Sequence, residues 1–116
     1  MKLVTVREVI ESGDLAAFRQ LLDPDVVWIG VYPGQLCRNR GEVLSMLDAP
    51  PASDRTVSPE LIGERDGMFA VAVHAEPPPE WVPDLHQVIV ARDERIVELR
   101  DYGSRADALA ALEASW

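Results

Sequence analysis

The chain is poor in cysteine and histidine, the residues on which disulfides and many metal sites depend. Its single cysteine, Cys37, cannot close a disulfide within the chain, so the fold does not require an oxidising compartment and we expect a cytoplasmic protein. Two histidines with no local spacing motif fall short of the converging ligands that a metal site needs. Because no glycine-rich phosphate loop occurs either, we expect neither a metal nor a cofactor.

Positive charge is also scarce, with 11 basic residues against 20 acidic ones and a net charge of -9. Such a field repels phosphate backbones and anionic lipid, so we expect no nucleic-acid and no membrane partner. No apolar run approaches the roughly 20 residues that cross a membrane. The chain has 116 residues, of which 47% are hydrophobic. This is enough apolar material for one packed domain, which we expect to cover residues 1–116.

The first half of the chain carries helix signals around one predicted strand. Apolar residues recur at spacings of three and four from Val6 to Leu22, and Gly13-Asp14 interrupts them, which predicts two short helices. Gly13 suits a left-handed residue at a helix end, and Asp14 suits the start of the next helix. Residues 25–32 are rich in β-branched and aromatic side chains and predict a strand, and residues 41–47 predict a third short helix.

The second half predicts two β-hairpins and a closing helix. Asp66-Gly67 tolerates the positive φ angles of a type I′ turn between two strands. Ser104 can cap the last helix with its hydroxyl group. The predicted elements are strands over residues 61–65, 68–75, 85–92 and 95–102, with the second turn at Asp93-Glu94, and a helix over residues 105–112.

The order of these elements, and three stretches of sequence within it, resemble the SnoaL-like branch of the nuclear transport factor 2-like superfamily. The stretches run from Gly13 to Trp28, from Cys37 to Leu44 and from Arg95 to Tyr102. The resemblance implies an α+β fold, a cone in which a curved mixed or antiparallel sheet is closed by about three N-terminal helices and a short C-terminal helix. It also implies an internal pocket and a homodimer.

The superfamily has no single activity, because one fold can carry many different sites. Its members include ketosteroid isomerases, limonene epoxide hydrolases, polyketide cyclases and proteins that only bind or assemble. Where the ketosteroid isomerases carry their proton-handling groups, this sequence has Val6, Gly30 and Val88, none of which can move a proton. The resemblance therefore implies no ketosteroid isomerase activity, and whether any reaction is catalysed stays open.

The last hairpin predicts a candidate catalytic pair. An unbroken register across its turn gives one face an apolar floor that ends in a histidine beside an aspartate. A neighbouring carboxylate orients an imidazole and stabilises its charged form, so His86 and Asp101 are the candidate acid–base residues. The alternative is structural, with His86 a hydrogen-bonded rim residue and Asp101 a cap for the following turn. The pairs expected on this face are Val90 with Val97, Val88 with Leu99, and His86 with Asp101.

Five further residues are candidate ligand contacts. Trp28 and Tyr32 lie on one face of the first predicted strand, where the small Gly30 leaves room between them. Val88 and Leu99 belong to the apolar floor of the last hairpin. A purely structural Trp28 is the alternative, since tryptophan buries well when its N–H is satisfied.

The roles of several other residues stay open. Cys37 lies next to Arg38 and near Arg40, which could lower its thiol pKa, although a buried and inert cysteine is the better interpretation. Whether Cys37, Arg40 or His74 reaches the pocket is not fixed by the pattern. Trp81, in a proline-rich loop, either covers the pocket mouth or a partner surface or belongs to a rigid exposed loop.

Two functions are compatible with this pattern. The first is a pocket domain for a small, largely apolar organic ligand, with or without acid–base chemistry of the isomerase, cyclase or hydrolase type. The alternative is a non-catalytic dimerisation module with a filled interior. In the expected homodimer, contact is made through the second face of the last hairpin, where apolar residues interrupt a polar surface. That face is expected to carry Gln87, Ile89, Glu98 and Arg100.

Overall fold

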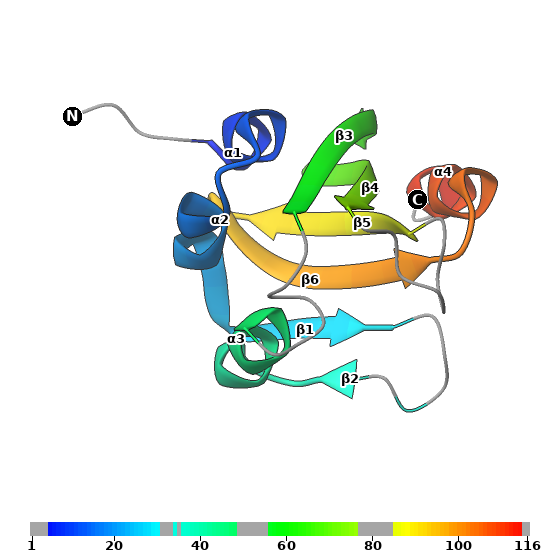
Figure 1. The fold of residues 1–116 in the computed structure, drawn as a ribbon. Helices are drawn as coiled ribbons and strands as arrows, with labels where there is room; N and C mark the ends of the chain where they lie inside the picture. The colour runs from blue at the N-terminus through cyan, green and yellow to red at the C-terminus, as the bar shows by residue number, and fades with distance from the viewer. Residues whose placement is uncertain (1–4, 31–33, 35, 49–55, 77–84, 115–116) are drawn as a thin grey trace.

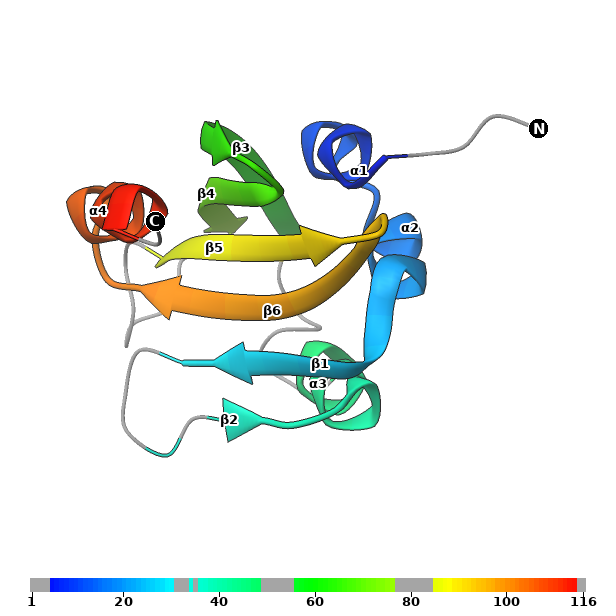
Figure 2. The same ribbon diagram turned by 180° about the vertical axis from the view of Figure 1, so that it is seen from behind.

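An open, mixed six-stranded sheet and four helices form the α+β fold, in a computed structural model that describes residues 5–30, 34, 36–48, 56–76 and 85–114. The strand order is β2-β1-β6-β5-β4-β3, in which β1 and β6 are parallel and the other neighbours are antiparallel. Figures 1 and 2 show β3, at one edge, standing at a steep angle to β5 and β6, so the sheet is strongly curved. The elements are α1 (Val6–Ser12), α2 (Leu15–Leu21), β1 (Leu22–Ile29), β2 (Leu36–Cys37), α3 (Arg40–Asp48), β3 (Thr56–Arg65), β4 (Met68–Glu76), β5 (Leu85–Arg92), β6 (Arg95–Tyr102) and α4 (Arg105–Ala114).

The helix ends form at the residues that the sequence indicated. Gly13 ends α1 in the left-handed region, with φ of 70°, and its N–H donates to two carbonyl groups of that helix. The Asp14 side chain accepts a hydrogen bond from the N–H of Ala17 at 3.1 Å, and Ser104 Oγ accepts one from the N–H of Asp107 at 3.1 Å. None of the described helices is long and apolar enough to cross a membrane.

Both predicted hairpins are present, and each has a turn with two positive φ angles. These angles are 42° at Asp66 and 83° at Gly67, and 53° at Asp93 and 61° at Glu94, as type I′ turns require. Strand β3 is longer than predicted and contains Pro59, which is tolerated because β3 lies at the edge of the sheet. Strand β2, only two residues long, was not predicted.

The two faces of the sheet bury different sets of side chains. Helices α1, α2 and α3 contribute to a core cluster over one face, here called the inner face, and α4 packs on the opposite, outer face. This arrangement confirms a sheet covered by three N-terminal helices and one C-terminal helix. The inner cluster contains Val6, Ile10, Val26, Val43, Phe69, Val71, Ile89, Ile96 and Leu99, and the outer cluster contains Ala70, Val88, Ala108 and Leu112.

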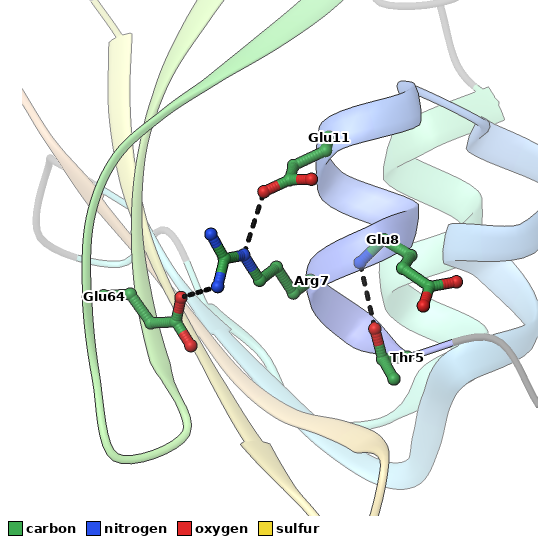
Figure 3. Close-up of polar contacts among 5 residues, drawn as sticks. All are labelled: Thr5, Arg7, Glu8, Glu11 and Glu64. Carbon is green, nitrogen blue, oxygen red and sulfur yellow. Dashed lines mark hydrogen bonds and ion pairs between the residues drawn. The ribbon is translucent and has the colours of Figure 1, made fainter.

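Helix α1 is also tied to the edge strand β3 by charge (Figure 3). Arg7 Nε donates to the carboxylate of Glu11 at 2.9 Å, and Arg7 Nη1 lies 3.2 Å from the carboxylate of Glu64 on β3. At the start of the same helix, Thr5 Oγ1 accepts from the N–H of Glu8 at 3.1 Å. These pairs are exposed, so the helix is held chiefly by its buried apolar residues.

Candidate functional site

A β-bulge in the last hairpin decides which side chains share the inner face. The two pairs next to the turn have the predicted register, but Val90 then lies opposite Glu98 in place of Val97. Val97 is therefore an extra residue, and each β6 side chain beyond it projects to the face opposite the predicted one. The apolar pattern explains the bulge, because Ile96 and Leu99 are three residues apart and a regular strand would not bury both in the inner cluster.

The predicted pairing of His86 with Asp101 is wrong for this reason. Asp101 lies opposite Gln87, and His86 lies opposite Tyr102. Since neighbouring residues of a strand project to opposite faces, the imidazole and the carboxylate are separated by the sheet. His86 Nδ1 is buried on the outer side and has no hydrogen-bond partner among the described residues.

Asp101 is held on the inner face by two nitrogen donors. Trp28 Nε1 donates to Asp101 Oδ2 at 2.9 Å, and Gln87 Nε2 donates to Asp101 Oδ1 at 2.8 Å. Gln87 is 9% exposed. Each carboxylate oxygen therefore has its own donor, which fixes the orientation of the group.

The surroundings of Asp101 change its proton affinity. Burial raises the pKa of this carboxyl group, because desolvation disfavours the charged form. The hydrogen bonds from Gln87 and Trp28 act in the opposite direction, since they favour the carboxylate, but they offset the effect of burial only in part. Asp101 thus retains a proton to a higher pH than an exposed aspartate does, which suits a group that takes up and returns a proton.

The parallel pairing of β1 with β6 brings Trp28 to the site. Trp28 lies opposite Leu99 across these strands, and Ile89 lies opposite Leu99 from the other side. Leu99 is 1% exposed, so its side chain is part of the packed core beside the carboxylate. The indole can then reach Asp101, which is two residues further along β6 on the same face.

The other candidate ligand contacts are distributed differently from the prediction. Val88 is on the outer face, where it packs in the cluster formed with α4, because its neighbour Ile89 on β5 belongs to the inner cluster and successive strand residues alternate between faces. Gly30 follows β1 directly and is partly buried. Two residues singled out in the sequence, Tyr32 and Trp81, lie outside the described residues.

Cys37, Arg40 and His74 have no part in the carboxylate's hydrogen bonds. Cys37 lies opposite Trp28, and its thiol pKa is raised by burial first and then by nearby carboxylate charge, so a lowered pKa is wrong. Arg40 is exposed at the start of α3. His74 is exposed, with Nε2 at 3.0 Å from the carboxylate of Glu60. Within the described ranges, no three His, Cys, Asp or Glu side chains converge as metal ligands would.

Gln87 is the functional candidate that the sequence interpretation missed. The predicted register places Gln87 on the second face of the hairpin, opposite Arg100 and on the same face as Ile89 and Glu98. That set is also wrong as a single surface, because Gln87 and Ile89 are on the inner face whereas Glu98 and Arg100 are on the outer one. The spacing of Ile96 and Leu99 was the signal that would have revealed the bulge.

Comparison with known proteins gives the family. The sequence profile of the SnoaL-like domain matches residues 4–104, whereas no curated protein matches the sequence. Wild-type IdmH from Streptomyces antibioticus, described as a candidate polyketide cyclase, is 25% identical, with a TM-score of 0.59 over 92% of each chain.

Two more distant structures have the same fold. An NTF2-like protein of unknown function from Cytophaga hutchinsonii is 10% identical, with a TM-score of 0.62 over 84% of this chain and 91% of its own. A candidate polyketide cyclase from Sinorhizobium meliloti is 16% identical, with a TM-score of 0.57 over 82% of this chain and 87% of its own. Because the family profile covers most of the sequence and these folds agree with it, the chain belongs to the SnoaL-like domain family of the nuclear transport factor 2-like superfamily.

Proposed function

We propose that the domain binds a small, largely apolar organic molecule against the inner face and exchanges a proton with it through Asp101. The observation that carries this proposal is a carboxylate held by Trp28 and Gln87 beside an apolar cluster. Ligand sites combine hydrophobic walls with a few placed polar groups. A titratable group with a perturbed pKa in such a setting marks a functional site more often than other carboxylates do.

The reaction class we propose is proton transfer at a carbon next to a carbonyl group. Two of the solved neighbours are described as candidate polyketide cyclases. Aldol-type ring closure joins the carbon next to one carbonyl group to the carbon of another carbonyl group, and it begins with the removal of such a proton. The C–H bond breaks, its electron pair remains on the ligand as an enolate, and the proton forms an O–H bond with the carboxylate. A desolvated carboxylate is a stronger base than an exposed one, which favours Asp101 in this role.

A binding screen with matched variants tests the proposal. Apolar ketones and diketones that bind should raise the melting temperature of the wild type. At a ligand concentration of 100 times the dissociation constant, the free energy of unfolding should rise by about 2.7 kcal/mol. Asp101→Asn should weaken the binding of a diketone in its enol form about 10-fold to 100-fold, because the hydrogen bond that the enol O–H donates to a charged carboxylate is lost. Asp25→Asn, at an exposed position of β1, removes the same charge and should bind as the wild type does. Equal binding by all three proteins would contradict the role of Asp101.

A dimerisation module without a ligand is the alternative, and the close packing of the inner core favours it. Val26 and Ile96 are 0% exposed and Leu99 is 1% exposed, so this part of the interior is filled by side chains. The same screen separates the two functions. Under the alternative, no apolar compound stabilises the wild type and the protein still forms dimers.

We expect a homodimer whose contact lies on the part of the outer face over β1 and β2. Ile29 and Leu36 lie opposite each other there, 37% and 44% exposed, with Arg100 beside Ile29 on β6. Exposed apolar pairs rimmed by charge are typical of contacts between subunits. Ile29→Glu should shift the mass measured by light scattering from twice 12.8 kDa toward 12.8 kDa, whereas Met46→Glu on α3 should not. A wild-type mass near 12.8 kDa at micromolar concentration would refute the dimer.

A further inference from the structure

The two oxygens of Asp101 have partners of different chemical kinds. The indole N–H of Trp28, which donates to Oδ2, can only donate a hydrogen bond. The carboxamide of Gln87, which donates to Oδ1 through Nε2, carries both a donor and an acceptor at its end. Gln87 can therefore exchange the two roles by rotating its amide group, and Trp28 cannot.

The environment of Gln87 allows this rotation at little cost. Among the described residues, its side chain is hydrogen-bonded to Asp101 and to no other group. The terminal torsion of glutamine is broad and roughly two-fold, so both orientations of the amide are accessible within one rotamer of the chain. On the neighbouring strand β4, Val71 lies opposite Gln87, and its apolar side chain offers the amide no competing hydrogen-bond partner.

We propose that Gln87 is a positioning residue whose carboxamide rotates with the protonation state of Asp101. It donates from Nε2 to the carboxylate, and it accepts through Oε1 from the O–H of the neutral acid. The inference rests on the proposed function, in which Asp101 takes a proton from a ligand and returns it. On uptake, an Oδ1 lone pair forms the O–H bond, the amide turns by half a rotation, and Oδ2 continues to accept from Trp28.

The rotation keeps the site hydrogen-bonded in both states. When the O–H of the neutral acid points at Gln87, a fixed amide sets its N–H group against that O–H, and a buried polar group left without a partner is costly. With rotation, Gln87 supports the acid as well as the carboxylate, whereas Trp28 mainly supports the carboxylate. The same side chains then serve both halves of a proton-transfer cycle.

Carboxyl carbon NMR of Asp101 across a pH series distinguishes a rotating amide from a fixed one. In the observed orientation, Gln87 lowers the pKa of Asp101 more than Trp28 does. A fixed amide therefore predicts that Gln87→Met, which keeps the length of the side chain, raises this pKa more than Trp28→Phe. A rotating amide predicts the reverse order, since the loss of Gln87 removes support from both protonation states. A larger rise in the Asp101 pKa for Gln87→Met than for Trp28→Phe would overturn the proposal.

A second measurement decides the question without a tryptophan variant. Asparagine in place of Asp101 resembles the neutral acid, because its oxygen must face Trp28 and its Nδ2 then faces Gln87. With rotation, adding Gln87→Met to Asp101→Asn breaks a hydrogen bond and lowers the folding equilibrium constant about 2-fold to 10-fold. An unchanged or higher constant would refute rotation. These readouts need no ligand, so they can fail while Asp101 proves essential for turnover, and they can succeed while the proposed function fails.

Discussion

An Asp101→Asn variant should turn over a ligand found in the binding screen about 10²-fold to 10⁴-fold more slowly than the wild type, because asparagine cannot accept a proton. The fold should survive, since the two side chains have the same shape. The asparagine oxygen can accept from Trp28, which now donates to Asp101 Oδ2 at 2.9 Å. A variant that retained the wild-type rate would exclude Asp101 as the acid–base group.

The same variant should be more resistant to urea than the wild type at neutral pH. The folded-state pKa of Asp101 is raised from its ordinary value of 3.8, mainly by desolvation, so the native state binds this proton more tightly than the unfolded state does. The resulting stabilisation is fully present below 3.8 and is lost as the pH rises through the folded-state value. At neutral pH the wild type carries a desolvated charge that the variant lacks.

The difference in unfolding free energy between the two proteins, followed across pH, isolates this effect from the other carboxylates. The advantage of Asp101→Asn should be largest at neutral pH and should shrink toward pH 3.8. Asp25→Asn removes a charge from an exposed position and should show no such trend. If the advantage of Asp101→Asn grew as the pH fell, desolvation would not be the dominant influence on this group.

Local chemistry was enough to predict most of the fold. The helix ends at Gly13 and Asp14 depend on groups within four residues, as does the cap at Ser104. The turns at Asp66-Gly67 and Asp93-Glu94 likewise depend on the φ angles of two residues each. Caps and turns of this kind depend only on residues that are close together in the sequence, so they can be predicted without knowing the tertiary structure.

The candidate site could not be predicted in the same way, because it depends on register. One extra residue, Val97, exchanges the faces of β6 and replaces His86 by Gln87 as the partner of Asp101. Trp28 reaches the carboxylate only through the parallel pairing of β1 with β6, which joins segments 73 residues apart. The sequence indicates Asp101 and Trp28 as candidate site residues, but their contact is a property of the assembled sheet.

Leu99→Ala should lower the free energy of unfolding by about 2–5 kcal/mol, the range for removing a buried leucine side chain. Leu99 is 1% exposed and lies between Trp28 and Ile89 on the inner face, so truncation leaves a cavity beside the indole. Urea unfolding monitored by circular dichroism measures this loss. Leu99→Met, which conserves volume, should cost less than about 1.5 kcal/mol.

Ligand binding by the folded Leu99→Ala variant tests whether Leu99 contributes to the ligand site as well as to the packed core. With the cavity beside it, Trp28 loses the packing that orients its N–H toward Asp101, so binding should weaken together with stability. Val88→Ala is the matched control, because Val88 is also 1% exposed but belongs to the outer cluster with α4. It should cost stability and leave the affinity for a ligand unchanged, since the sheet lies between it and the carboxylate. Equal weakening of binding by both variants would show that affinity follows overall stability and not the inner face.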